Sequence, residues 1–484
     1  MSERLAELLS LGARCNECPL GPKGCLRENP YDPVTAEYHE DDEAIVVGSH
    51  PSQADLSAGH PFGGESGGVW NDAAVAIGKH RTNFAITYAV ACVPPGQASG
   101  GMERMAKKLE RINKQRLSDG KLPLPSPQDC CRPRLFNEVA PFRNIITLGK
   151  RALTAITGDS RSVTKARGDF IEYDRDWRRI RRDPESGDLS IDGQPVNESA
   201  VYRKVLPTLE PSFVAKSPGW QAFWYQDLGK AIRWFENRLR WIEPLLLLEP
   251  TADQLKRWLE VKAPFWVFDV ETEYRDFLEA YLRCYGFATP DVDANGRAVM
   301  PGADYDMVAR SVGVSLLSGD GSSRLCNPDE EEGILDVTRW FLSDRSKLKV
   351  GSNAGYVDRM VMERLGSEDG PIINYPCNPV VPWLPVPTRR LVVEPVLDNL
   401  FLSRAWLPEV PKGLKTVGTA LTDIGHWENE GGAAAENDRD RLIYNTRGDT
   451  VVNARIIRPL VDIAKERGYF DIIVGGDRER RVHD

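Results

Sequence analysis

The sequence predicts an α/β protein with two domains. The chain has 484 residues, which is too long for one ordinary domain. Short apolar runs typical of buried strands alternate with amphipathic segments typical of helices, and this alternation indicates a layered α/β fold. Residues 243–250, EPLLLLEP, contain two prolines around an apolar run and indicate a junction between domains at 1–242 and 250–484.

The N-terminal domain is expected to have three layers, α/β/α. Strands are predicted at 43–52 and 83–95, where prolines end each apolar run. RNIITLGKRALTAITG, residues 143–158, predicts a strand, a glycine turn and a helix. Longer helices are expected at 102–117 and at 220–242, the second with an aromatic face.

The C-terminal domain is expected to begin with a helix and a strand. TADQ, residues 251–254, has the spacing of a capping box, which predicts a helix start. WVFDVETEY, residues 266–274, then predicts a strand. Further strands are expected at 311–318 and 347–353, and further helices at 356–366, 394–406 and 436–458.

Charge and hydropathy limit the classes of partner. The net charge of -9 gives no overall attraction to nucleic acid, so any such surface must be a local basic patch. No apolar stretch approaches the length needed to span a membrane, and the first residues lack the form of a signal peptide. We therefore expect a soluble cytoplasmic protein with no membrane partner.

Two acids interrupt the apolar run of the strand predicted at 266–274. Asp269 and Glu271 are two residues apart, so a strand presents both carboxylates on the same side. Buried strands avoid carboxylates unless something offsets the charge, and a divalent cation would do so. The alternative is that this strand frays and both acids reach water.

Two more acids fall on the apolar faces of predicted helices. Asp358 belongs to a stripe with Val361, Met362 and Leu365, and Asp449 lies at helical spacing from Val452 and Ile456. Four acids directed at a core from three elements suit a two-metal site. Such sites activate water and stabilise the leaving oxygen in phosphodiester cleavage.

Residues 250–484 resemble the DEDD 3′–5′ exonucleases, in particular the proofreading domain of family-A DNA polymerases. The motifs FDVET, GSNAGYVD and YNTRGD carry this resemblance and occur in the family's order. It implies an RNase H-like mixed sheet, a DNA substrate and two Mg²⁺ or Mn²⁺ ions. The implied metal ligands are Asp269, Glu271, Asp358 and Asp449, while Tyr444 would orient the attacking water and Asn353 would contact the nucleotide.

The third motif departs from the family. Four residues separate Tyr444 from Asp449, whereas the family has three beside a tyrosine. A local bulge at Gly448 would absorb the additional residue, and Asn445 is the alternative to Tyr444. No polymerase module is recognised in these residues, so we expect a separate DNA polymerase chain as partner.

Cysteines indicate a second metal or cluster site. Of the nine in the chain, five form two tight groups: Cys15, Cys18 and Cys25, then Cys130 and Cys131. CNEC, ACVPP and DCCRPRL, with VGSHPSQADLSAGHPFGGESGGVW, make residues 10–235 similar to family 4 uracil-DNA glycosylases. The resemblance implies a [4Fe–4S] cluster on Cys15, Cys18, Cys92 and Cys131, with Cys25 or Cys130 as substitutes and zinc as the alternative metal.

The catalytic positions of that family are altered. Ser49, Tyr88 and Glu210 stand where the family has glutamate, asparagine and histidine, whereas Phe62, which would stack on a flipped base, is present. An ionised Glu210 would oppose the negative charge on a departing uracil. We therefore expect no uracil excision, although His50 is a possible substitute.

Three roles remain open for the N-terminal domain. It is a DNA-binding scaffold, a repair enzyme that excises another base, or a docking module for a polymerase. The basic segments 104–116 and 175–182, the second with Trp177, are either DNA contacts or solvated faces. The combination of domains is similar to the N-terminal part of some large phage DNA polymerases, which implies a phage-encoded protein.

Overall fold

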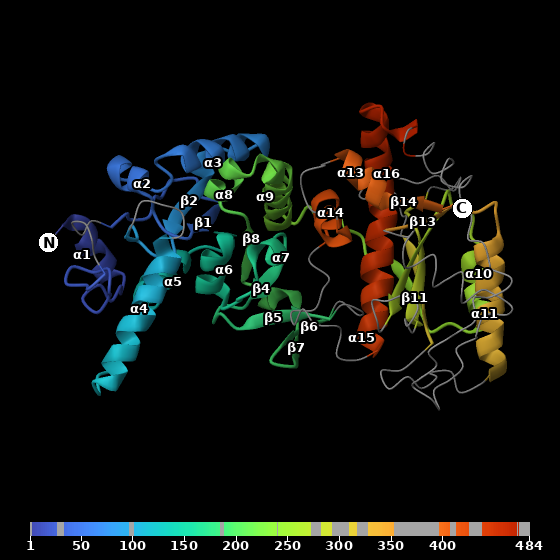
Figure 1. The fold of residues 1–484 in the computed structure, drawn as a ribbon, viewed down its shortest axis with the longest axis horizontal. Coiled ribbons are helices and arrows are strands. Elements are labelled where there is room, and N and C mark those ends of the chain that lie inside the picture. The colour runs from blue at the N-terminus through green and yellow to red at the C-terminus, as the bar shows by residue number, and fades with distance from the viewer. Residues whose placement is uncertain are drawn as a thin grey trace. The chain divides into compact units, whose positions relative to one another are not determined.

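The computed structural model describes most of the chain and divides it into two compact units, Met1–Leu239 and Arg240–Asp484 (Figure 1). The described residues are 2–26, 33–95, 101–183, 188–239, 241–272, 282–292, 309–316, 328–352, 396–406, 413–424, 438–471 and 473. Each unit contains helices and one sheet of mixed strand direction, which confirms the predicted α/β class. Among the described helices, none has the length and apolarity that a membrane crossing requires.

The N-terminal unit has an eight-stranded sheet in the order β2-β1-β3-β8-β4-β5-β6-β7. Its parallel part consists of β1 (Ala44–Gly48), β2 (Phe84–Tyr88), β3 (Asn144–Leu148) and β8 (Arg203–Thr208). An antiparallel extension follows in β4 (Ile171–Tyr173), β5 (Arg179–Arg182), β6 (Leu189–Ile191) and β7 (Gln194–Val196). Because parallel strands are buried on both faces, they appear in the sequence as continuous apolar runs.

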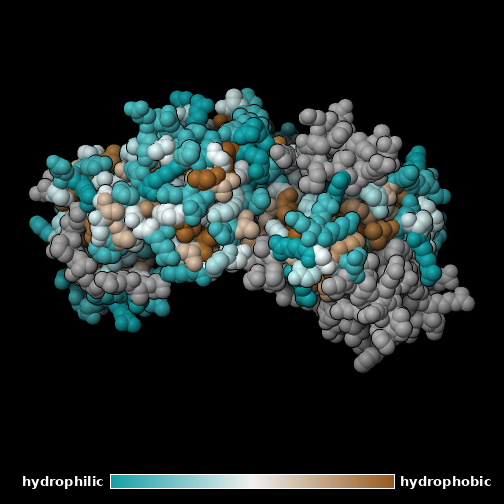
Figure 2. Space-filling view, turned by 90° about the horizontal axis from the view of Figure 1, so that it is seen from above, coloured by the Kyte–Doolittle hydropathy of each residue, from teal (hydrophilic) through white to brown (hydrophobic). Residues whose placement is uncertain are grey.

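Helices cover both faces of this sheet. They are α1 (Glu3–Ser10), α2 (Gln53–Ala58), α3 (Glu65–Ala76), α4 (Gly101–Ser118), α5 (Pro127–Val139), α6 (Gly149–Thr157), α7 (Val163–Ala166), α8 (Pro211–Lys216) and α9 (Gln221–Phe235). Val46 packs with Trp70 of α3 and Trp224 of α9, whereas Val47 packs with Leu135 of α5 and α6 residues on the other face. The predicted three layers are therefore present. In the view of Figure 2 the surface of this unit is mainly hydrophilic, and its hydrophobic residues form small separate groups.

The C-terminal unit has a six-stranded sheet in the order β14-β13-β10-β11-β12-β9. The strands are β9 (Leu245–Leu248), β10 (Trp266–Thr272), β11 (Leu282–Thr289), β12 (Arg310–Ser315), β13 (Lys349–Gly351) and β14 (Val396–Asp398). The central β10, β11 and β12 are antiparallel, and the outer strands run parallel to their neighbours. The predicted junction at 243–250 thus contains an edge strand of this sheet, because β9 pairs with β12.

Helices lie on both sides of the second sheet in Figure 1. They are α10 (Ala252–Leu259), α11 (Pro328–Ser343), α13 (Asn399–Trp406), α14 (Leu414–Leu421), α15 (Asp438–Ile443), the π-helix η4 (Tyr444–Asp449) and α16 (Thr450–Glu466). Leu259 and Phe341 of α10 and α11 form a core with Phe268 and Phe287 of the sheet, and α16 lies on the opposite face. Thr251 and Gln254 form the predicted capping box.

Candidate functional site

Three of the four predicted acids meet at one place in the C-terminal unit. Asp269 and Glu271 point to the same side of β10, and Asp449 is the last residue of η4. One carboxylate oxygen from each lies within 4.8 Å of the other two. Asp358 and Asn353 lie outside the described residues. Oxygen donors at this spacing fit a divalent cation such as Mg²⁺ or Mn²⁺.

The additional residue in the third motif is absorbed by the π-helix. Tyr444 and Asp449 are five positions apart, and a π-helix brings i and i+5 onto one side, as an α-helix does for i and i+4. Burial raises the pKa of Tyr444, and the negative charges of Asp449, Glu271 and Asp269 raise it further. The Tyr444 hydroxyl is therefore within electrostatic range of all three acids.

Two glycines allow η4 to approach the sheet. Gly286 of β11 pairs with both Asp269 and Gly313 of the neighbouring strands. A Cβ on Gly286 would lie 2.6 Å from the Asn445 Oδ1, and one on Gly313 would lie 2.0 Å from the Thr446 Oγ1. Any larger residue at either position would force the helix away from the strand that carries the acids.

Asn445 holds one of the acids in place. Its Nδ2 donates a hydrogen bond to Asp269 Oδ2 at 2.5 Å, and the residue is fully buried. Its Oδ1 has no hydrogen-bond partner among the described residues. The sequence suggested Asn445 only as an alternative to Tyr444, whereas the geometry makes it a positioning residue for Asp269.

The acid cluster is electrostatically unfavourable without a cation. Burial raises the pKa of Glu271 to about 7, and the charge of Asp449 contributes to this shift. Arg441 and Lys415 act in the opposite direction, and the Lys415 Nζ lies 4.8 Å from the centroid of the Tyr444 ring. Sequence reasoning missed both cations, because basic residues on helices are common and no motif marks these two.

The cysteines of the N-terminal unit are brought together around α5. Cys18, Cys92, Cys130 and Cys131 belong to one buried cluster, Cys15 to the adjacent one, and Cys25 is exposed. A hydrogen bond between the Cys18 and Cys130 thiols raises the pKa of the first and lowers that of the second. Cys130 is therefore at least as well placed as Cys131 to face Cys18.

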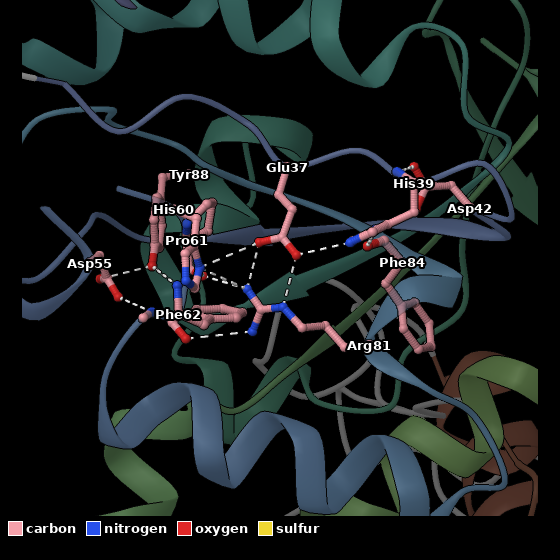
Figure 3. Close-up of polar contacts among 11 residues, drawn as sticks. Glu37, His39, Asp42, Asp55, His60, Pro61, Phe62, Arg81, Phe84 and Tyr88 are labelled. Atoms are coloured by element: carbon pink, nitrogen blue, oxygen red, sulfur yellow. Dashed lines mark hydrogen bonds and ion pairs between the residues drawn. The ribbon is translucent and has the colours of Figure 1, made fainter. Parts of the chain in front are cut away.

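Tyr88 fills the predicted base pocket at the carboxyl ends of the parallel strands. Its hydroxyl accepts a hydrogen bond from the Phe62 N–H and donates one to Asp55 Oδ2, both at 3.0 Å (Figure 3). A Cβ on Gly48 would lie 2.7 Å from its ring, which also meets the Phe62 ring edge-on at 5.7 Å. Phe62 is consequently only 6% exposed, with the Tyr88 ring against it.

A polar network fixes the loop that carries Phe62. The second oxygen of Asp55 accepts a hydrogen bond from the Gly63 N–H at 2.7 Å. Arg81 binds Glu37 with two nitrogens, at 2.6 and 2.9 Å, and donates to the Pro61 carbonyl at 2.5 Å (Figure 3). Sequence reasoning did not identify Asp55 or Arg81, since each looks like an ordinary surface residue.

Ser49 and His50, which follow the last residue of β1, lie near Glu210. Glu210 lies against Gly149, where a Cβ would be 2.5 Å from its Cγ and where φ is +84°. Burial raises the pKa of Glu210, while a hydrogen bond from Ser49 and the charge of His50 lower it. Burial thus favours the neutral acid, whereas the sequence-based argument assumed an ionised carboxylate.

The chain has low similarity to proteins of known structure. No curated protein matches the sequence. Among solved structures, an apo nuclease is 11% identical (TM-score 0.30) over 49% of this chain and 89% of its own. NrnC of Brucella melitensis bound to pGG is 13% identical (TM-score 0.28), with 49% and 89% covered. Escherichia coli RNase D, titled an exoribonuclease involved in structured RNA processing, is 13% identical (TM-score 0.29), with 49% and 50% covered.

These TM-scores are too low to support an argument about this chain. The model of the uracil DNA glycosylase superfamily matches residues 36–231, all within the N-terminal unit. The match covers the four parallel strands and the Tyr88 pocket at their carboxyl ends. Residues 36–231 are therefore similar to the uracil DNA glycosylase superfamily.

Proposed function

We propose that the chain is a divalent-metal-dependent 3′–5′ exonuclease that acts on DNA, and that its N-terminal unit is glycosylase-like. The observation that carries the proposal is the group of carboxylates from Asp269, Glu271 and Asp449, within 4.8 Å of one another beside Tyr444. Two bound cations would supply activation of water and stabilisation of the leaving oxygen. Asp358 is proposed as the fourth ligand and Asn353 as a nucleotide contact.

The residues of this site have distinct proposed roles. Asn445 holds Asp269 in its ligand orientation through the 2.5 Å hydrogen bond. The Tyr444 hydroxyl orients the attacking water, while Lys415 and Arg441 place positive charge where a scissile phosphate would lie. The 3′–5′ direction and the DNA substrate follow from the motif resemblance. A separate DNA polymerase is the proposed partner, with replication or repair in a phage-infected cell as the setting.

The N-terminal unit is proposed to bind DNA or a polymerase without excising uracil. Tyr88 covers both Gly48 and Phe62, so a flipped base has no room to stack. Excision of another base is the second candidate, and the Ser49–Glu210 contact beside His50 is the observation that favours it. The buried cysteines are proposed to hold a [4Fe–4S] cluster through Cys15, Cys18, Cys92 and either Cys131 or Cys130, with zinc as the alternative.

A comparison of Asp449→Asn with Asp462→Asn tests the exonuclease. Asp462 is an exposed acid on α16, the helix that follows Asp449, so the second variant is a charge-matched control. With a 5′-labelled single strand and Mg²⁺ or Mn²⁺, the wild-type protein and the control should shorten DNA from the 3′ end. Asp449→Asn should be slower by about 100-fold or more, because losing a metal ligand misplaces the ion. Equal rates in the two variants would refute the assignment.

A further inference from the structure

A row of alternating arginine and aromatic side chains crosses the N-terminal unit. The Arg132 guanidinium lies 5.3 Å from the Phe136 ring, and the Phe136 and Trp177 rings are 4.9 Å apart. Arg203 follows, at 4.4 Å from the Trp177 ring and 4.7 Å from the Tyr202 ring. We call these five residues the arginine–aromatic row. Each contact lies within the range of cation–π or aromatic pairing.

Unpaired positive charge lies at both ends of this row. Arg143 and Arg175 lie 5.0 and 4.9 Å from the Tyr202 ring. Like Arg132 at the other end, both are exposed, and no carboxylate of a described residue pairs with any of the three. Arg132, Arg143 and Arg175 are consequently available to an anionic ligand.

The row is held in place before any ligand binds. The Asp174 carboxylate accepts hydrogen bonds from the backbone N–H groups of Asp176 and Arg178, at 2.9 and 2.8 Å, and so fixes the loop of Trp177. Arg203 is 5% exposed and donates to the carbonyl of Arg175 at 2.8 Å. Because rings and cations are already ordered, a ligand would bind them with a small entropic cost.

The row lies at the amino ends of the parallel strands, whereas the glycosylase-like pocket lies at their carboxyl ends. Arg143 immediately precedes β3, and Tyr202 and Arg203 stand at the start of β8. Tyr88, by contrast, ends β2, and the pocket it fills is at the carboxyl ends of the same parallel strands. The row is therefore a separate surface and not a part of that pocket.

We propose that the arginine–aromatic row binds single-stranded DNA. Exposed guanidinium groups would neutralise phosphates, and the half-buried Phe136, Trp177 and Tyr202 rings would stack on unpaired bases. A duplex fits less well, because its base faces are already covered by neighbouring base pairs. The choice of DNA over RNA rests on the proposed function.

Fluorescence anisotropy tests this inference by measuring how tightly the full chain binds a labelled oligothymidylate. The oligomer has about 20 nucleotides, which exceeds common site sizes. Measuring it in EDTA leaves the carboxylate cluster of the other unit without cations, so that cluster repels phosphate. The first variant removes the exposed cations of the row: Arg132→Ala, Arg143→Ala and Arg175→Ala together. The control removes three exposed lysines of the same unit that lie outside both basic segments: Lys121→Ala, Lys165→Ala and Lys216→Ala together.

The row variant should bind about tenfold or more weakly, and the slope of log affinity against log salt should fall by about 2. The lysine control should stay within about twofold of wild type. Tyr202→Leu should weaken binding about fivefold or more, whereas Tyr202→Phe, which keeps the ring, should not. Circular dichroism of each variant establishes that it has folded.

Three results would overturn the inference: equal losses in the row variant and the lysine control, unchanged binding by the row variant, or duplex binding as tight as single-strand binding. An RNA oligomer that binds more tightly than DNA would overturn the choice of DNA. The two proposals have separate readouts, because anisotropy in EDTA measures binding without cleavage, whereas the Asp449→Asn comparison measures the exonuclease rate alone. Loss of binding only in the row variant supports the row even if no variant degrades DNA.

Discussion

One methyl group added at Gly313 tests whether the close contact between η4 and the sheet positions the acids. A Cβ there would lie 2.0 Å from the Thr446 Oγ1 and 2.9 Å from the Leu442 Cδ1. Thr446 is not free to rotate away, because its hydroxyl donates to the Leu442 carbonyl at 2.6 Å. Restoring an ordinary contact of 3.4 Å from 2.0 Å requires a shift of 1.4 Å.

That shift determines the expected magnitudes. Overpacking a close contact costs about 1–3 kcal/mol in the free energy of unfolding, so we expect Gly313→Ala to destabilise the C-terminal unit by about 2 kcal/mol. Asn445 and Asp449 belong to the same helical segment, so the helix displaces both when it moves. A displacement of about 1 Å at a catalytic site lowers rates by about 100-fold, and we expect a loss of that size.

The assays are urea unfolding and 3′-end degradation of a 5′-labelled single strand. Gly413→Ala is the matched control, because a Cβ at Gly413 would meet no atom of a described residue within 4 Å. Adding Thr446→Ala to Gly313→Ala removes the oxygen that clashes and should restore most of the rate, which a general loss of stability would not explain. A Gly313→Ala protein with the wild-type rate, or a double variant as slow as the single one, would refute the reasoning.

Three other changes have expected outcomes. Burial lowers the pKa of Lys349 to about 8 from 10.5, so the unfolding free energy of the C-terminal unit should rise as pH increases from 8 to 10.5. Lys349→Met should lose most of this rise, measured by urea unfolding at pH 7 and pH 10. Tyr88→Phe leaves the Phe62 N–H without its partner and removes one of the two hydrogen bonds that Asp55 Oδ2 accepts, the other coming from the Ser52 N–H. A drop of about 1–3 kcal/mol in the unfolding free energy of the N-terminal unit should be seen in the same assay, and no change would contradict it. In an Asp449→Asn background, uracil-containing DNA should gain no abasic sites, and abasic-site formation would show that Tyr88 leaves the pocket.

Several strands and the acid pair were predictable because both depend on local periodicity. Continuous apolar runs located the parallel strands β1, β2 and β3 but not β8, and the two-residue spacing of Asp269 and Glu271 placed both on one side of β10. The spacing of Tyr444 and Asp449 even indicated a bulge. Each of these properties depends on fewer than ten consecutive residues of the chain.

Contacts between distant segments were not predictable in this way. In the sequence, Gly286 and Gly313 look like ordinary strand glycines. Only the structure shows that Asn445 and Thr446 of η4 pack against them. The sequence likewise indicated that Phe62 is present but not that Tyr88 packs on it, since the two lie on different elements. Burial of Glu210 against Gly149 is a third case, because the ionisation of a carboxyl depends on tertiary surroundings.

The pairing of β9 decides where the C-terminal unit can be cut from the rest of the chain. Arg455 lies 4.2 Å from the Trp241 ring and donates to the Ile242 carbonyl at 2.8 Å, and Arg447 binds the Glu243 carboxylate at 2.6 Å. A recombinant fragment beginning at residue 250 would lose these anchors and leave the β12 edge bare, ready to recruit strands from other molecules. A fragment beginning at residue 240 keeps the edge covered and is the better starting point for expression.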